Sequence, residues 1–186
     1  NLIGGTGVDQ FNITTAGADL TGSISGAGGD DQVTVGANQV GGSIDGQGGA
    51  DTITLQNGAR VTGGVLGGTE NDTIALNGNV TSDISGDAGA DTFTFATGAV
   101  LVGQIDGGSL ATANDGDAGD VINGGDTATL YRITGANDGV LEGRMTGFFD
   151  VQNLVAGTGI DTFRFEGGAI LGGAGGVAGT ITGGDS

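Results

Sequence analysis

Aspartates recur at a nearly constant interval along this chain, and each of them closes a glycine-rich turn. The turns read GGTGVD (4–9), GAGGDD (26–31), GQGGAD (46–51), GGTEND (67–72), GDAGAD (86–91) and AGTGID (156–161). The final aspartates of the first five turns are 22, 20, 21 and 19 residues apart. A turn carboxylate can help to bind a hard cation, or it can accept hydrogen bonds from nearby amides while glycine adopts a positive φ. The residues alone leave both interpretations open.

The composition excludes several other kinds of function. The chain has 186 residues with 45 glycines and a net charge of −18, and its four basic residues are all arginines. Nucleic-acid binding requires clustered Lys and Arg, and no apolar run reaches the ~20 residues of a membrane span, so we expect neither partner. The chain also lacks the His, Cys and Lys that act as nucleophiles or near-neutral bases. We therefore expect no enzyme, although paired carboxylates keep a polysaccharide-acting β-helix module as an alternative.

The segments that follow the aspartates predict the fold. Apolar and polar residues alternate in DTITL (51–55), as in a half-buried strand, and a small NGA turn (57–59) leads to a second apolar segment, VTGGV (61–65). Two such strands cannot bury their apolar faces alone, but successive coils can do so by stacking. We predict an all-β fold, namely a right-handed parallel β-solenoid of the β-helix or β-roll kind, with about 20 residues per coil.

The same pattern divides one continuous domain into three parts. Regular coils are predicted over 1–107, divergent coils with a polar loop insertion over 108–150, and resumed coils over 151–186. The insertion carries a second acidic group, Asp115, Asp117 and Asp120, in the run DGDAGD. This run lacks the spacing of an EF-hand, so we interpret it as a solvated loop in preference to a cation site.

A longer repeat is visible as well. NLIGGTGVDQF (1–11) and NLVAGTGIDTF (153–163) are identical at seven of eleven positions and lie 152 residues apart. Neither end of the chain resembles the capping elements that close a solenoid. We therefore expect a piece of a longer array, and the exposed coil edges predict self-association or continuation of that array.

The glycine-aspartate turns are similar to the GGxGxDxUx repeat of the RTX family, whose parallel β-roll binds calcium in its turns. The likeness is partial, because only the turn at 4–9 fits GGxGxD fully and each coil carries one turn of this kind. The resemblance implies Ca²⁺ as a cofactor. Its candidate carboxylate ligands would be Asp9, Asp31, Asp51, Asp72, Asp91 and Asp161.

Two longer segments, DTITLQNGARVTGGVLGG (51–68) and the stretch 130–173, resemble the repeat regions of giant bacterial surface proteins and autotransporter-like adhesins. This resemblance implies an extracellular or bacterial cell-surface location and a structural role as an adhesin stalk, surface-layer element or matrix fibre. It does not name a surface partner or glycan. A third class, the ice-binding solenoids, would use TxT rows such as Thr52/Thr54 and Thr92/Thr94, but other coils interrupt these rows and threonine is a common strand residue.

Overall fold

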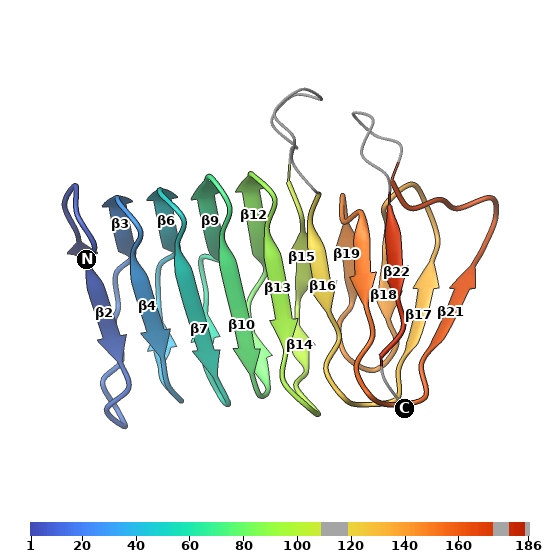
Figure 1. The fold of residues 1–186 in the computed structure, drawn as a ribbon. Coiled ribbons are helices and arrows are strands. Elements are labelled where there is room, and N and C mark those ends of the chain that lie inside the picture. Colours follow the sequence, from blue (N-terminus) through green and yellow to red (C-terminus); the bar gives the residue numbers. More distant parts are fainter. Residues whose placement is uncertain (109–118, 173–178, 185–186) are drawn as a thin grey trace.

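Alternating apolar and polar residues form short and mostly parallel strands in the computed structural model, which describes residues 1–108, 119–172 and 179–184. In β7 (Thr52–Gln56), Ile53 and Leu55 are buried and Thr52 is exposed. Each strand pairs in register with its equivalent one coil away, as Ile53 does with Ile74. The described residues form an all-β solenoid with about 21 residues per coil and contain no helix, which confirms the predicted fold class (Figure 1).

Three sheets run along the column, and we call them A, B and C. In spatial order, sheet A contains β1 (Leu2–Ile3), β3 (Ile24–Gly28), β6 (Ile44–Gly48), β9 (Val65–Thr69), β12 (Ile84–Ala88), β15 (Gln104–Asp106), β19 (Gly147–Phe149), β18 (Gly139–Leu141), β17 (Leu130–Ile133) and β21 (Thr162–Phe165). Sheet B contains β2 (Gln10–Ile13), β4 (Gln32–Val35), β7, β10 (Thr73–Asn77), β13 (Thr92–Phe95), β16 (Val121–Asn123), β20 (Asn153–Val155) and β22 (Thr180–Thr182). Sheet C is shorter, with β14 (Leu101–Val102), β11 (Val80–Thr81), β8 (Arg60–Val61) and β5 (Gln39–Val40).

Each regular coil therefore has three sides instead of the two strands that the sequence suggested. Where a single second strand was expected over 61–65, the chain forms β8, bends, and then forms β9. The bend lies at Gly63 and Gly64, and Gly64 has a φ of 90° that favours glycine. The predicted NGA turn is present before β8, where the N–H of Ala59 donates to the carbonyl of Gln56 at 2.9 Å.

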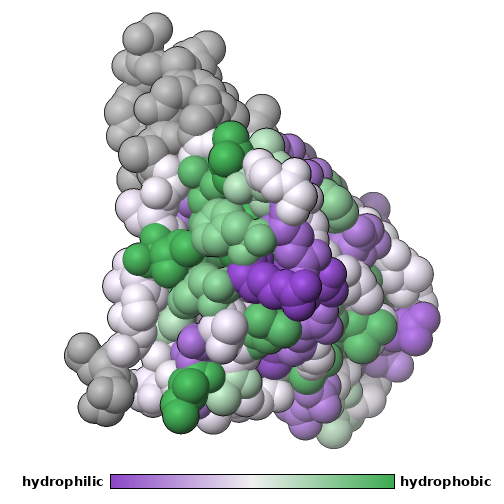
Figure 2. Space-filling view, turned by 90° about the vertical axis from the view of Figure 1, so that its right-hand side faces the viewer, coloured by the Kyte–Doolittle hydropathy of each residue, from purple (hydrophilic) through white to green (hydrophobic). Residues whose placement is uncertain are grey.

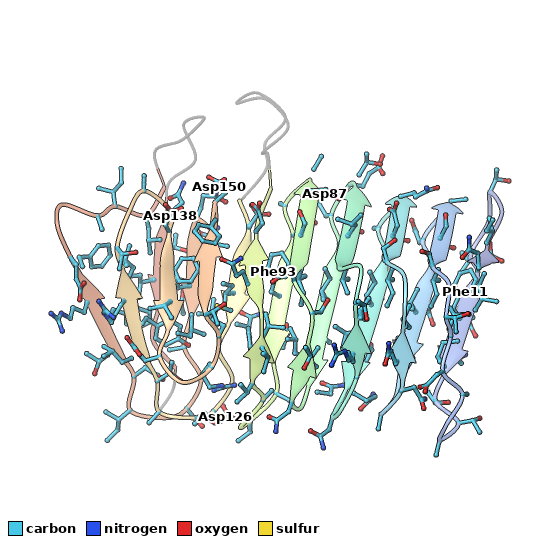
Figure 3. The ribbon with its side chains drawn as sticks, turned by 180° about the vertical axis from the view of Figure 1, so that it is seen from behind. Phe11, Asp87, Phe93, Asp126, Asp138 and Asp150 are labelled. Atoms are coloured by element: carbon cyan, nitrogen blue, oxygen red, sulfur yellow. The ribbon has the colours of Figure 1, made fainter. Side chains whose placement is uncertain are left out.

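The core is a set of apolar columns that run along the axis. One column on sheet A consists of Ile24, Ile44, Val65, Ile84 and Ile105, all of them buried and paired in register. Phe93 of β13 points into the interior from sheet B (Figure 3). Because each buried aliphatic or aromatic side chain contributes roughly 1.5–3 kcal/mol, stability is added coil by coil along the column.

The winding changes after β15. The chain forms β16 on sheet B, then moves outward on sheet A to β17 and returns through two antiparallel pairings, β17 with β18 and β18 with β19. Strand β19 packs against β15 in parallel, and the next strand, β20, continues sheet B on β16. Sheet A thereby has ten strands and sheet B eight, so the column is taller on one side. This three-stranded meander lies in the region 108–150, where regular coils were not expected; residues 109–118 of that region are outside the described part.

Sheet C ends at β14, where Arg144, from the loop between β18 and β19, bonds to the last strand. The carbonyl of Arg144 accepts the N–H of Leu101 in β14 at 2.7 Å, at the edge of this sheet. Its guanidinium is buried, donates to the carbonyls of Ala99 and Ala96, and lies 5.4 Å from the ring centroid of Phe95. Burial lowers the pKa of this guanidinium. The backbone of Arg144 thus closes the third side of the column, and its side chain satisfies the carbonyls of the turn at 96–99.

Replacing Arg144 by Met should lower the free energy of unfolding by about 1–3 kcal/mol, because the buried carbonyl of Ala99 loses its donor. The matched control is Arg60→Met, which removes an exposed arginine from β8 and should have little effect. Chemical denaturation of both variants measures the difference. Equal stabilities would show that the Arg144 side chain does not stabilise the turn at 96–99.

Candidate functional site: a buried aspartate ladder

The aspartates that close the glycine-rich turns point into the column and form one row. Each precedes a strand of sheet B and follows the turn from sheet A. The row contains five of the six candidate ligands, Asp9, Asp31, Asp51, Asp72 and Asp91, and it continues to Asp120. We call this row the aspartate ladder. All its members except Asp9 are buried.

Hydrogen bonds join each member of the ladder to the next coil. The backbone N–H of Asp31 donates to Oδ1 of Asp51 at 2.7 Å, and the N–H of Asp51 donates to Oδ1 of Asp72 at 2.7 Å. The other links have the same direction and lengths of 2.7 to 2.9 Å, from Asp9 to Asp31, Asp72 to Asp91 and Asp91 to Asp120. Each buried carboxylate therefore satisfies a buried backbone donor one coil away, which strand pairing leaves unpaired at the turn.

A glycine five residues before each of the first five aspartates of the ladder makes room for the other carboxylate oxygen. A Cβ added at Gly46 would lie 2.1 Å from Oδ2 of Asp51 and 2.3 Å from the carbonyl oxygen of Gly67. The same close approach to the aspartate Oδ2 recurs at Gly4, Gly26, Gly67 and Gly86. These glycines are required by contact with a carboxylate, and each glycine-aspartate pair closes one turn.

Burial and repulsion by neighbouring carboxylates favour the neutral form of Asp51 and Asp72 and raise the pKa of each. Burial raises the pKa of Asp72 to about 8; the N–H of Asp51 opposes this shift, and the negative charges of Asp91, Asp51 and Glu70 add to it. Burial also raises the pKa of Asp51. Within the described residues, Oδ2 of Asp31, Asp51 and Asp72 has no hydrogen-bond partner. A proton on Asp72 lowers the charge repulsion at the middle of the ladder.

Exposed carboxylates at the turns behave differently. Hydrogen bonds from the hydroxyl of Thr69 and the N–H of Gly49 lower the pKa of Glu70. At the opposite edge of the column, the N–H of Thr158 lowers the pKa of Asp126 (Figure 3). Hydrogen bonds at the surface thus lower the pKa of Glu70 and Asp126, whereas burial raises the pKa of Asp51 and Asp72.

Asp106, Asp138 and Asp150 form a second acidic group where the meander meets the regular coils. Asp138 and Asp150 lie along the edge that also carries Asp87 (Figure 3). Partial burial raises the pKa of Asp150, and the charges of Asp106 and Asp138 raise it further.

The remaining sequence-predicted residues lie apart from the ladder or outside the described residues. Asp161 accepts the N–H of Thr129 at 2.8 Å and precedes β21 of sheet A, so it belongs to a different stack. Asp115 and Asp117 lie outside the described residues. Asp120, which we had assigned to a solvated loop, is buried in the ladder, and its N–H donates to Oε1 of Gln152 at 2.7 Å. The signal that could have identified it is the run DAGDVI (117–122), which matches DAGADTF (87–93) but for one residue before the strand.

The ladder supplies one carboxylate per coil, with Oδ1 bonded to an amide and Oδ2 packed against a glycine. Calcium takes six to eight oxygen ligands. Among the described residues, no group of three or more acidic side chains is arranged to hold a metal ion. Calcium binding stays a prediction of the sequence.

The outer face of sheet B carries the TxT positions. Thr52 and Thr54 pair in register with Thr73 and Ala75, and these with Thr92 and Thr94. The threonines therefore lie one above another on one face of the column, and Ala75 interrupts one of the two rows. Ice binding by this face stays a prediction.

Comparison with known proteins assigns no identity to this chain. No family model, no curated protein and no solved structure matches it. None of the described residues belongs to a helix long and apolar enough to cross a membrane. The class established by the structure is that of a β-solenoid repeat protein.

We expect the protein to lose stability as the pH rises from about 5 to 9. An unfolded aspartate has a pKa near 3.9, so folding binds a proton at Asp72 between that pH and the folded pKa of about 8. This stabilisation is fully present below the unfolded pKa and is lost as the pH rises through the folded pKa. Thermal melting across this range measures the trend. Asp72→Asn, which is neutral at every pH, should flatten the trend, whereas Asp45→Asn on the outer face should not. Equal pH profiles for all three proteins would contradict a proton on Asp72.

Gly46→Ala should destabilise the protein by about 1–3 kcal/mol or more, because the methyl group overlaps Asp51 Oδ2 and a backbone carbonyl. Gly7→Ala is the matched control, since a Cβ there meets nothing within 4 Å. Urea unfolding of the two variants compares them directly. If both changed stability by the same amount, the close glycine-carboxylate packing would not be a requirement of the fold.

Proposed function

We propose that this chain is a structural repeat segment of an extracellular cell-surface or matrix protein, in which it extends and spaces other parts as an adhesin stalk, surface-layer element or fibre. The observation that carries this proposal is the aspartate ladder. It repeats one bonding pattern from coil to coil, so coils add length to the column while the buried amide at each turn keeps its acceptor. That property suits an element whose task is to span a distance.

The surface supports the same role. The net charge of −18 keeps repetitive chains from associating side by side, and the exposed turn carboxylates are held in place by backbone donors. The resemblance to bacterial adhesin repeats supports the extracellular location. The polysaccharide-acting and ice-binding alternatives stay untested, and no specific contact favours either of them.

In this role, a bound calcium ion would screen the acidic surface and stiffen the column. Its support is the charge of the chain and the partial likeness of the turns to RTX repeats. Any ion that binds only the folded form would raise the melting temperature by mass action.

Proteins that carry one, two and four copies of this chain in tandem test the spacing role. Small-angle X-ray scattering should give a maximum dimension that increases by a constant amount with each added copy, because each coil adds about 4.8 Å. The same samples, measured in millimolar calcium and in chelator, test whether calcium raises the melting temperature.

A maximum dimension that stays constant as copies are added would show that the copies collapse on one another, and would overturn the spacing role. The control is the same series with flexible Gly/Ser linkers between the copies, whose dimension should grow less steeply. Labelling of intact and permeabilised cells of the producing organism with an antibody to this chain tests the location. Labelling only after permeabilisation would overturn the extracellular assignment.

A further inference from the structure

A groove lies on the side of the column, at the corner where sheet A meets sheet C. It has a volume of about 530 Å³ and runs across β9, β12, β15 and β19. The corner is hollow at β9 because Gly64 carries no side chain, whereas the equivalent positions in the next two coils hold Asp83 and Gln104. Small-molecule sites typically have volumes of about 300–1,000 Å³. The groove is therefore large enough for one small ligand.

The outward side chains of sheet A form one row along the groove. Leu66 pairs in register with Ser85, and Ser85 pairs with Asp106. Asp106 in turn pairs with Phe149, which is 40% exposed. Because neighbouring strands are about 4.8 Å apart, the carboxylate of Asp106 and the ring of Phe149 are next to each other on one face. The row thus offers an aromatic ring, a carboxylate, a hydroxyl and an aliphatic side chain in that order.

Carboxylates give the groove a negative charge. Asp83 and Asp106 line it, and no lining residue that the structure describes is basic. Partial burial raises the pKa of Asp150, the residue after Phe149, and the charges of Asp106 and Asp138 raise it further. The negative field therefore reaches the Phe149 end of the groove. An occupant of complementary charge is a cation.

The carboxylates of the groove lack the cationic partners that another acid of the chain has. Near β21, Glu166 binds Arg132 at 2.8 Å and Arg164 at 3.0 Å, and Figure 2 shows this end of the molecule with hydrophilic and hydrophobic residues interspersed. Within the described residues, no salt bridge involves either carboxylate of the groove. Arg60 lines a smaller hollow on sheet C that shares Asp83 with the groove. The described residues therefore do not supply the positive charge that would complement the groove.

The lining favours an organic cation over a metal ion. Calcium takes six to eight oxygen ligands, and no group of three or more acidic side chains in the described residues is arranged to hold a metal. Leu66 and Phe149 instead place apolar surface in the same row as the carboxylate of Asp106. An ammonium group that carries methyl groups is attracted to the face of an aromatic ring and can also contact an aliphatic side chain. The protein makes a related contact in its interior, where the guanidinium of Arg144 lies 5.4 Å from the ring centroid of Phe95.

We propose that this groove binds a small organic cation with an alkylated ammonium head. The head lies between the ring of Phe149 and the carboxylate of Asp106, and the rest of the molecule follows the row towards Leu66. Asp83 adds a second negative charge at the corner. This site is independent of the proposed spacing role, because the groove lies on the side of the column and its occupation leaves the stacking of the coils unchanged.

An NMR titration of the isotope-labelled chain with choline tests the site. Choline should shift the amide signals of Ser85, Asp106 and Phe149 in a saturable way, with a Kd in the millimolar range. The uncharged analogue of choline, in which carbon replaces the ammonium nitrogen, has the same shape and should bind roughly threefold more weakly or worse. Phe149→Ala and Asp106→Asn should each weaken choline binding by about two- to fivefold, because a single exposed cation–π or charge contact has an effect of this size.

Phe165→Ala and Asp45→Asn are the matched controls and should bind choline like the unchanged chain. Phe165 is an exposed phenylalanine on β21, and Asp45 pairs with Leu66 in the outward row but does not line the groove. A peptide with one trimethyllysine, compared with choline, distinguishes a protein side chain from a free small molecule as the source of the head, since the natural source should bind more tightly. Equal binding of choline and its uncharged analogue, or no saturable shift up to about 50 mM choline, overturns the proposal. Displacement of choline by an equal concentration of calcium would also overturn it, because the groove would then be a metal site.

Discussion

A backbone amide buried at the turn between sheets A and B must find an acceptor inside the column, and this requirement organises the molecule. The acceptor is the carboxylate of the next coil, so the spacing of aspartates has to equal the length of one coil. In the turns of Asp9 to Asp91 the carboxylate in turn requires a glycine five residues earlier, because any larger residue would occupy the space of Oδ2. Coil length, aspartate and glycine are therefore parts of one constraint rather than three separate features of the sequence.

The same arrangement has an electrostatic cost that the protein meets by neutralisation. Burial raises the pKa of Asp72, and the negative charges of its neighbours in the ladder add to this shift, so a proton on Asp72 relieves both costs. At the end of the ladder the acceptor is Gln152, which offers the same kind of oxygen without a charge. A neutral amide there and a protonated carboxyl in the middle are two solutions to the same problem.

The periodic part of this structure was predictable, and the breaks in the period were not. The spacing of Asp9 to Asp91 predicted stacked coils, because regular aspartates and alternating strands indicate the same winding. It did not indicate that the carboxylates face inward, since a turn carboxylate that binds a cation and one that bonds an amide have the same sequence. Sheet C was not predicted because Gly63 and Gly64 divide into β8 and β9 a segment that reads as one strand. The place of Asp120 in the ladder was missed because the segment 108–118 separates it from the regular spacing of the other aspartates. The meander of β17 to β19 follows no repeat, so only tertiary contacts such as those of Arg144 define it.

The two copies of the longer repeat, 1–11 and 153–163, lie on exchanged sheets. Sheet A has ten strands and sheet B eight, so the column is uneven beyond β15. The copy of β1 lies in sheet B as part of β20, and the copy of β2 lies in sheet A as β21. The same residues can therefore form either side of the column, because a coil depends on alternating apolar residues and a glycine-aspartate turn, and both sheets accept that pattern.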